Sequence, residues 1–152
     1  MTAEVRDAEM ADHPEWHRMW LANCAHYGVS IPAMEDTELW RRIMDPDHPV
    51  HCLVCGASAG NGSLLGFANY VLHPHTFSAR MVCHLEDLWI EPSARGAGWG
   101  GKLIDALVAR GHARGWRRIY WHTEGDNTAA RRLYDRVSRL TNLVRYDISL
   151  PG

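Results

Sequence analysis

The chain has 152 residues, of which 46% are hydrophobic and 22% are charged, and its formal net charge is −2. This length and apolar content predict one globular domain, residues 1–152, with a substantial core. The near-neutral charge argues against nucleic acid or an anionic membrane surface as a partner. No apolar run approaches the roughly 18 residues that a membrane span needs, and the start of the chain lacks the hydrophobic segment of a secretory signal. We therefore expect a cytoplasmic protein.

The first part of the chain predicts a short strand and two helices. Residues 4–6 have the character of a strand. Asp12 is a suitable N-cap and Pro14 a suitable first-turn residue for a helix that Gly28 ends. A second helix is expected over residues 36–44, where apolar residues recur at helical spacing before an Asp-Pro pair stops the pattern.

The middle of the chain changes to strand-like patterns. Two apolar runs, residues 50–57 and 64–72, flank Ala59-Gly60-Asn61-Gly62, which is a strong hairpin-turn signal. A third run over residues 81–90 is closed by Pro92. We expect these runs to form three consecutive antiparallel strands.

The rest of the chain predicts two helices, over residues 98–114 and 127–137, and two strands, over residues 118–122 and 142–150. The full order of elements predicts an α+β fold with a mixed, mostly antiparallel sheet of roughly six to seven strands flanked by about four helices. Residues 85–122 would form a central β-α-β unit with a right-handed crossover.

Two of the four cysteines, Cys52 and Cys55, form a C-x-x-C pair close to His48 and His51. In a strand these two thiols would point to opposite faces of the sheet. No second pair of ligands follows at the spacing of a zinc site. We therefore expect buried, reduced thiols and no metal.

A glycine-rich stretch, residues 95–101, lies between the strand ending near Ile90 and the helix that follows. Free backbone N–H groups and the positive end of the dipole make the start of a helix an anion site. Glycine lets the backbone approach a ligand without a Cβ in the way, and Arg95 adds a charge suited to phosphate. The stretch predicts a site for a cofactor pyrophosphate, with a simple connecting turn as the alternative.

The spacing Gly96-x-Gly98-x-x-Gly101 also satisfies the fingerprint of Rossmann-type dinucleotide-binding enzymes, and Glu124 follows at a distance suited to a ribose contact. However, the unit begins past the middle of a short chain, which leaves no room for a full doubly wound sheet. The strands before it are also expected to be joined by hairpins. A Rossmann-type enzyme is therefore the alternative interpretation.

The helix expected over residues 127–137 places Asn127 and Tyr134 about two turns apart, on nearly the same face. An amide and a phenol aligned in this way can line a groove beside the glycine-rich stretch. From spacing alone, an N-cap and a core position are the favoured roles of these two residues.

In combination, these motifs resemble the GNAT superfamily of N-acetyltransferases. The sequence Arg-Gly-Ala-Gly-Trp-Gly at residues 95–100 is similar to its Q/R-x-x-G-x-G/A signature, and residues 85–90 are similar to the L-E-D strand of polyamine and small-amine acetyltransferases. Residues 118–123 and 143–146 resemble the branch that contains yeast histone, polyamine and D-amino-acid acetyltransferases. The resemblance is strong over residues 85–150 and weak before them. At residues 124–127 the chain departs from the Trp-Asn of polyamine relatives.

The resemblance implies the GNAT fold, acetyl-CoA as co-substrate without a metal, and direct attack of a primary amine on the thioester in a ternary complex. The backbone of residues 88–90 would pair with pantetheine like an added strand, and an N–H there would stabilise the oxyanion. Tyr134 would act as the general acid that protonates the departing thiolate. The implied cofactor-binding residues are Leu88, Trp89, Ile90, Arg95, Gly96, Ala97, Gly98, Trp99, Gly100, Gly101, Asn127, Ala130 and Tyr134.

Glu86 is the candidate for the base that deprotonates the ammonium substrate, or for its anchor. A carboxylate inside an apolar strand is costly unless it is paired or functional, and a structural ion pair would explain it equally well. In a regular strand Glu86 and Asp87 point to opposite faces, so only one of them would face the groove.

The sequence does not identify the acceptor, and a polyamine, an amino acid or a lysine side chain would each fit. The family also implies a homodimer. A non-catalytic module that only binds acetyl-CoA is a further alternative, although such a module would need neither Tyr134 nor Glu86.

Overall fold

The computed structural model describes residues 3–57 and 63–152, so the hairpin turn predicted at residues 59–62 lies outside the described residues. The chain divides into two compact units, Met1–His122 and Thr123–Gly152. Among the helices of the described residues, none is long and apolar enough to cross a membrane.

The described residues of the first unit form a sheet, three α-helices and two 3-10 helices. In chain order these are β1 (Glu4–Asp7), η1 (Met10–Asp12), α1 (His13–His26), α2 (Ala33–Met44), β2 (Val50–Gly56), β3 (Leu64–Pro74), β4 (Met81–Ile90), η2 (Pro92–Ala94), α3 (Trp99–Arg114) and β5 (Ile119–Tyr120).

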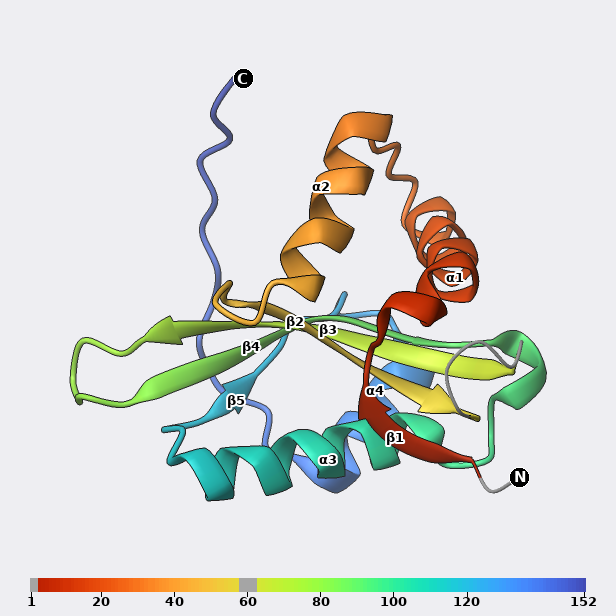
Figure 1. Ribbon diagram of the computed structural model, residues 1–152. Coiled ribbons are helices and arrows are strands. Elements are labelled where there is room, and N and C mark those ends of the chain that lie inside the picture. The colour runs from red at the N-terminus through yellow and green to blue at the C-terminus, as the bar shows by residue number, and fades with distance from the viewer. Residues whose placement is uncertain (1–2, 58–62) are drawn as a thin grey trace. The chain divides into compact units, whose positions relative to one another are not determined.

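The strands of the described residues form one five-stranded sheet in the order β1-β2-β3-β4-β5. The pairings from β1 to β4 are antiparallel, and β5 is parallel to β4. Helices α1 and α2 lie over one face of this sheet and α3 lies over the other (Figure 1). The predicted mixed sheet and β-α-β unit are confirmed, but six to seven strands is wrong. The antiparallel run from β1 to β4 also rules out the parallel, doubly wound Rossmann sheet.

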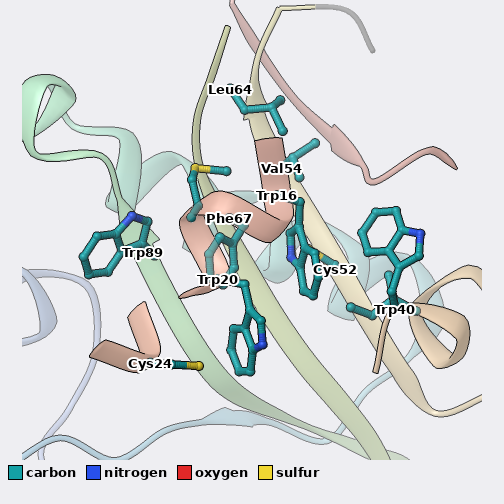
Figure 2. Packing of buried hydrophobic residues seen from close by; sticks show 11 residues of the cluster. Trp16, Trp20, Cys24, Trp40, Cys52, Val54, Leu64, Phe67 and Trp89 are labelled. Atoms are coloured by element: carbon teal, nitrogen blue, oxygen red, sulfur yellow. The ribbon is translucent and has the colours of Figure 1, made fainter. Parts of the chain in front are cut away.

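The core between α1, α2 and the sheet is rich in aromatic side chains (Figure 2). The rings of Trp16 and Trp20, one turn apart on α1, stack with centroids 5.8 Å apart. Both rings also contact Phe67 of β3 at 6.2 Å. These large side chains bury much apolar surface and fix α1 on β3. Other members of this cluster are Met19, Cys24, Trp40, Ile43, Cys52, Val54, Leu64 and Trp89.

On the opposite face, α3 buries Leu103 and Leu107 against the sheet. Gly111 of α3 lies against Trp116, where a Cβ would come within 3.2 Å of the indole ring. Arg110 of α3 donates hydrogen bonds to the Tyr70 hydroxyl at 3.0 Å and to Asp7 at 2.6 Å. This helix is therefore held on β1 and β3, and its N-terminus is fixed beside the end of β4 by the short segment that joins them.

Asp12 occupies the predicted N-cap position of α1, but its side chain does not cap that helix. Its carboxylate accepts hydrogen bonds from both Nη atoms of Arg6, at 2.8 and 2.9 Å, and from the Glu9 N–H at 2.8 Å. Although burial opposes the shift, the Arg6 pair holds the pKa of Asp12 below its ordinary value. The predicted N-cap position is therefore confirmed, but the side chain makes no capping hydrogen bond because a guanidinium from β1 binds the carboxylate instead.

The second unit contains one helix, α4 (Thr128–Val137), close to its predicted bounds. Residues 142–150 do not form the predicted strand. Because a strand exists only where its backbone pairs with a neighbour, the alternating apolar pattern alone does not produce one. The large apolar side chains of this segment are exposed: Leu143, Val144, Tyr146, Ile148 and Leu150.

Candidate functional site

Strands β4 and β5 separate part-way along β4. The two strands pair only at Cys83 with Ile119 and His84 with Tyr120, whereas β4 continues to Ile90. Over residues 85–90, β4 pairs with β3 on one side, and no strand of the described residues pairs with its other edge. The edge therefore presents unpaired backbone N–H and C=O groups, to which an extended ligand can add like a strand. Leu88, Trp89 and Ile90 lie on this edge.

A β-bulge interrupts β4 at Glu86. Asn69 of β3 lies opposite Asp87, and the next residue, Tyr70, lies opposite Leu85, so Glu86 has no partner residue. Since cross-strand partners project to the same face, the bulge places Asp87 with Asn69 on the face that α1 covers. A strict two-residue alternation would have placed Asp87 on the other face.

The bulge leaves Glu86 at the surface. Its side chain is 48% exposed, and one carboxylate oxygen lies 3.2 Å from Nδ1 of His84. The His84 ring stacks on Tyr120 at 4.5 Å and contacts His122 edge-on at 5.4 Å. Glu86 therefore stands at the point where β4 and β5 part, beside a group of aromatic side chains.

Asp87, rather than Glu86, is the carboxylate that the strand partly buries. Its Oδ2 accepts a hydrogen bond from Nδ2 of Asn69 at 3.1 Å, and the Asn23 side chain of α1 also hydrogen-bonds to it. Burial, with a smaller contribution from the negative charge of Glu86, raises the pKa of Asp87 to about 6 against the two hydrogen bonds. The argument that a strand carboxylate must be paired or functional thus applies to Asp87. A period-two pattern cannot identify Asp87, because the bulge changes the face on which it lies.

The raised pKa of Asp87 predicts a specific pH dependence of stability. Because the folded protein holds this proton more tightly than the unfolded chain, whose carboxyl has its ordinary pKa of 3.8, the contribution of Asp87 to the free energy of unfolding falls as pH rises from about 4 to about 6. Over that window the fall should amount to about 3 kcal/mol. Denaturant unfolding of the wild type and Asp87→Asn at several pH values measures it, since the amide does not titrate. Parallel pH profiles for the two proteins would contradict the assigned burial.

The glycine-rich stretch turns the chain from β4 into α3. Gly96 and Gly98 adopt left-handed backbone conformations, with φ of +84° and +86°, which glycine alone adopts without cost. Neither has a heavy atom within 4 Å of an added Cβ, so the space in front of the turn is open. Gly98 is the N-cap of α3, and no side chain caps this end. The first-turn N–H groups, from Trp99 to Gly101, have no acceptor within the helix and are available to an anion.

Two basic side chains border this turn. The Nε of Arg95 donates to the Ile90 carbonyl at 2.9 Å, and its guanidinium lies 4.9 Å from the centre of the Trp89 ring. The Nζ of Lys102 lies 4.3 Å from the centre of the Trp99 ring. These contacts hold positive charge at both ends of the turn, which suits a phosphate-bearing ligand. Lys102 was not among the predicted site residues.

In the second unit, Asn127 caps α4. Its Oδ1 accepts from the Ala130 N–H at 3.3 Å, and its Nδ2 donates to Oγ1 of Thr123 at 3.3 Å. The predicted N-cap is therefore confirmed. Tyr134 is half-buried, and none of the α4 side chains is fully buried. The alternative in which Tyr134 is a core residue thus finds no support within this unit.

The four cysteines are free thiols, and all four are buried. Cys52 belongs to the core under α1 and Cys55 does not, which agrees with the expected opposite faces. Within residues 3–57 and 63–152, no group of three or more His, Cys, Asp or Glu side chains is placed to hold a metal ion.

In this site, the unpaired edge of β4 leads into a glycine-lined helix start that no side chain caps. The family resemblance predicts this arrangement. The model of the acetyltransferase (GNAT) family matches residues 8–138. The chain belongs to this family. The match spans most of both compact units, and it shows that the protein is an N-acetyltransferase of a family that uses acetyl-CoA.

Individual relatives agree with this assignment. The D-amino-acid N-acetyltransferase HPA3 of Saccharomyces cerevisiae is 29% identical over 145 residues, which cover 93% of the chain and 88% of the relative. The uncharacterized N-acetyltransferase YhfO of Bacillus subtilis is 30% identical over 94 residues, or 60% of the chain and 63% of YhfO. The structure of AAC(6')-Iy in complex with a bisubstrate analog has the same fold, with a TM-score of 0.82 at 19% identity over 99% of the chain and 100% of that structure.

Proposed function

We propose that this GNAT enzyme transfers the acetyl group of acetyl-CoA to a primary amine, by direct attack of the amine in a ternary complex. The observation that carries the proposal is the continuous path from the unpaired edge of β4 into the open turn before α3. The edge of β4 suits an extended, amide-containing chain, and the turn before α3 suits a pyrophosphate.

The donor site would be built mainly from backbone groups. Leu88, Trp89 and Ile90 would offer their N–H and C=O groups to pantetheine, and residues 96–101 would offer N–H groups to the pyrophosphate, with Arg95 adding charge. Glycine at positions 96 and 98 supports this assignment, because their φ values and open surroundings leave the backbone accessible. From the second unit, Asn127 and Ala130 would complete the cofactor contacts, as the family resemblance implies.

Two side chains would move protons. Acetyl-CoA supplies a thioester, which is an activated acetyl group. Glu86 would accept the proton that an ammonium must lose before it becomes a nucleophile, and its exposed position beside His84 gives that proton a route to solvent. Tyr134 would donate a proton to the leaving thiolate. A backbone N–H on the edge of β4 would stabilise the negative charge on the carbonyl oxygen.

The acceptor is proposed to be a small primary amine. HPA3 is a D-amino-acid N-acetyltransferase, so D-amino acids belong in the first acceptor panel, together with polyamines and lysine peptides. We also propose a homodimer, which sedimentation velocity would test; a single monomeric species at micromolar concentration would contradict it.

The donor assignment predicts a selective thermal shift. Acetyl-CoA should raise the unfolding temperature in a concentration-dependent manner, because a ligand that binds only the folded state stabilises it. NAD at the same concentration should leave the temperature unchanged. Stabilisation by NAD and not by acetyl-CoA would overturn the proposed function.

A further inference from the structure

Two carboxylates of this chain are buried in different ways. Asp12 is 2% exposed and is paired with the guanidinium of Arg6. Asp87 has only neutral amides, those of Asn23 and Asn69, as hydrogen-bond partners, and the charged group that acts on it most is the acidic Glu86. No cationic side chain of the described residues forms an ion pair with Asp87. A partly buried carboxylate without a counter-ion is costly unless a cation reaches it from outside.

The two amides beside Asp87 also have unused acceptors. Asn23 and Asn69 are each only 3% exposed. The Oδ1 atom of each is buried and has no hydrogen-bond partner within the described part of the chain. Their Nδ2 groups face the Asp87 carboxylate, since a carboxylate can only accept. The cluster therefore combines a carboxylate whose hydrogen-bond donors are only neutral amides with two buried amide oxygens that have no donor.

We propose that Asn23, Asn69 and Asp87 form the binding site for the primary ammonium group of the acceptor amine. An ammonium carries one positive charge and three N–H donors, so it supplies the counter-ion that Asp87 lacks and donors for the two amide oxygens. This inference rests on the proposed function, because it assigns the acceptor side of that reaction.

The place of the cluster in the fold supports this role. Asp87 directly follows the bulge, at the level where the free edge of β4 begins, and its neighbour Glu86 is exposed. Asp87 is itself only partly buried, so the cluster has an opening to solvent. The two acidic residues then have separate tasks: Asp87 binds the ammonium form, and Glu86 accepts the proton when the amine is released for attack.

The test uses two cations of equal charge and different hydrogen-bonding capacity. Methylammonium should cause saturable shifts of the Asn23 and Asn69 side-chain amide signals in NMR spectra of the full-length protein. Tetramethylammonium has no N–H donor and should cause none. In Asp87→Asn the dissociation constant for methylammonium should rise by about 30-fold or more, the usual consequence of removing the partner of a desolvated charge. Asp105→Asn, the same change at an exposed carboxylate of α3, should leave it unchanged.

Three outcomes would overturn the inference: equal shifts with both cations, no shift in the wild type, or unaltered methylammonium binding in Asp87→Asn. The thermal shift with acetyl-CoA, measured on the same samples, separates these failures from failure of the proposed function and shows whether each variant is folded. A wild type that binds acetyl-CoA but not methylammonium at this cluster refutes the ammonium site alone. Asn69→Leu provides a second variant, for which we expect weakened methylammonium binding and intact acetyl-CoA binding.

Discussion

Replacement of Gly98 by valine should raise the dissociation constant for acetyl-CoA by about 100-fold. Gly98 has φ of +86°, where a β-branched residue is strained, so the backbone would rotate and turn N–H groups of the loop away from the ligand. Loss of two charge-assisted hydrogen bonds at about 1.5 kcal/mol each accounts for this factor. Isothermal titration calorimetry with acetyl-CoA measures it.

Gly115 provides a matched control at the other end of α3. It too has a left-handed conformation, with φ of +73°, and it has no heavy atom within 4 Å of an added Cβ. Gly115→Val should therefore lower the free energy of unfolding by an amount similar to that for Gly98→Val, about 1–2 kcal/mol, without weakening acetyl-CoA binding. Equal loss of affinity in both variants would mean that the glycine-rich turn acts only through stability.

Replacement of Tyr134 by phenylalanine should lower kcat for acetyl transfer by about 10²-fold or more, because general acid catalysis contributes a factor of that size. The dissociation constant for acetyl-CoA should change little, since the aromatic ring remains. Steady-state kinetics with a saturating amine, together with calorimetry, separates the two effects.

Tyr146→Phe is the control for this experiment, because Tyr146 lies in the exposed segment after α4 and has no proposed catalytic role. Its kcat should equal that of the wild type. If kcat of Tyr134→Phe is also unaltered, Tyr134 is not the general acid, and another donor protonates the thiolate.

The local structure of the proposed donor site could largely be predicted from sequence, because it depends on local features. A glycine-rich turn between a strand and a helix specifies backbone conformation directly, and Gly96 and Gly98 have the positive φ angles that such a turn requires. The strand before the turn and the helix after it were also found near their predicted bounds. Arg95 lies beside the turn and donates a hydrogen bond to Ile90 at the end of β4. Its positive charge is therefore close to the turn that was predicted to bind a phosphate.

The proposed acceptor site could not be predicted in the same way, because it depends on strand register. One extra residue at Glu86 changes which face Asp87 occupies, and no residue pattern in β4 marks the bulge. Asn23 and Asn69 are far apart in sequence and meet Asp87 only when α1 packs on β3 and β4. The sequence therefore identified the acidic pair Glu86 and Asp87, but a two-residue alternation could not show which of the two carboxylates the fold would bury.

The predicted strand over residues 142–150 was wrong for a related reason. Its alternation of apolar residues satisfies the local requirement for a strand, but pairing is a property of two segments. Asp12 also shows that local sequence does not determine the partner of a side chain. Its sequence context fits an N-cap, but its carboxylate binds Arg6 of β1.

The central claim is that the protein moves an acetyl group from acetyl-CoA to a primary amine. The most direct test incubates the protein with acetyl-CoA and a panel of D-amino acids, polyamines and lysine peptides, and quantifies both free thiol and acetylated amine. We expect at least one amine to give the two products in equal amounts, at a rate that depends on Tyr134. Binding of acetyl-CoA without turnover of any amine would contradict the claim and would identify the protein as a non-catalytic member of its family.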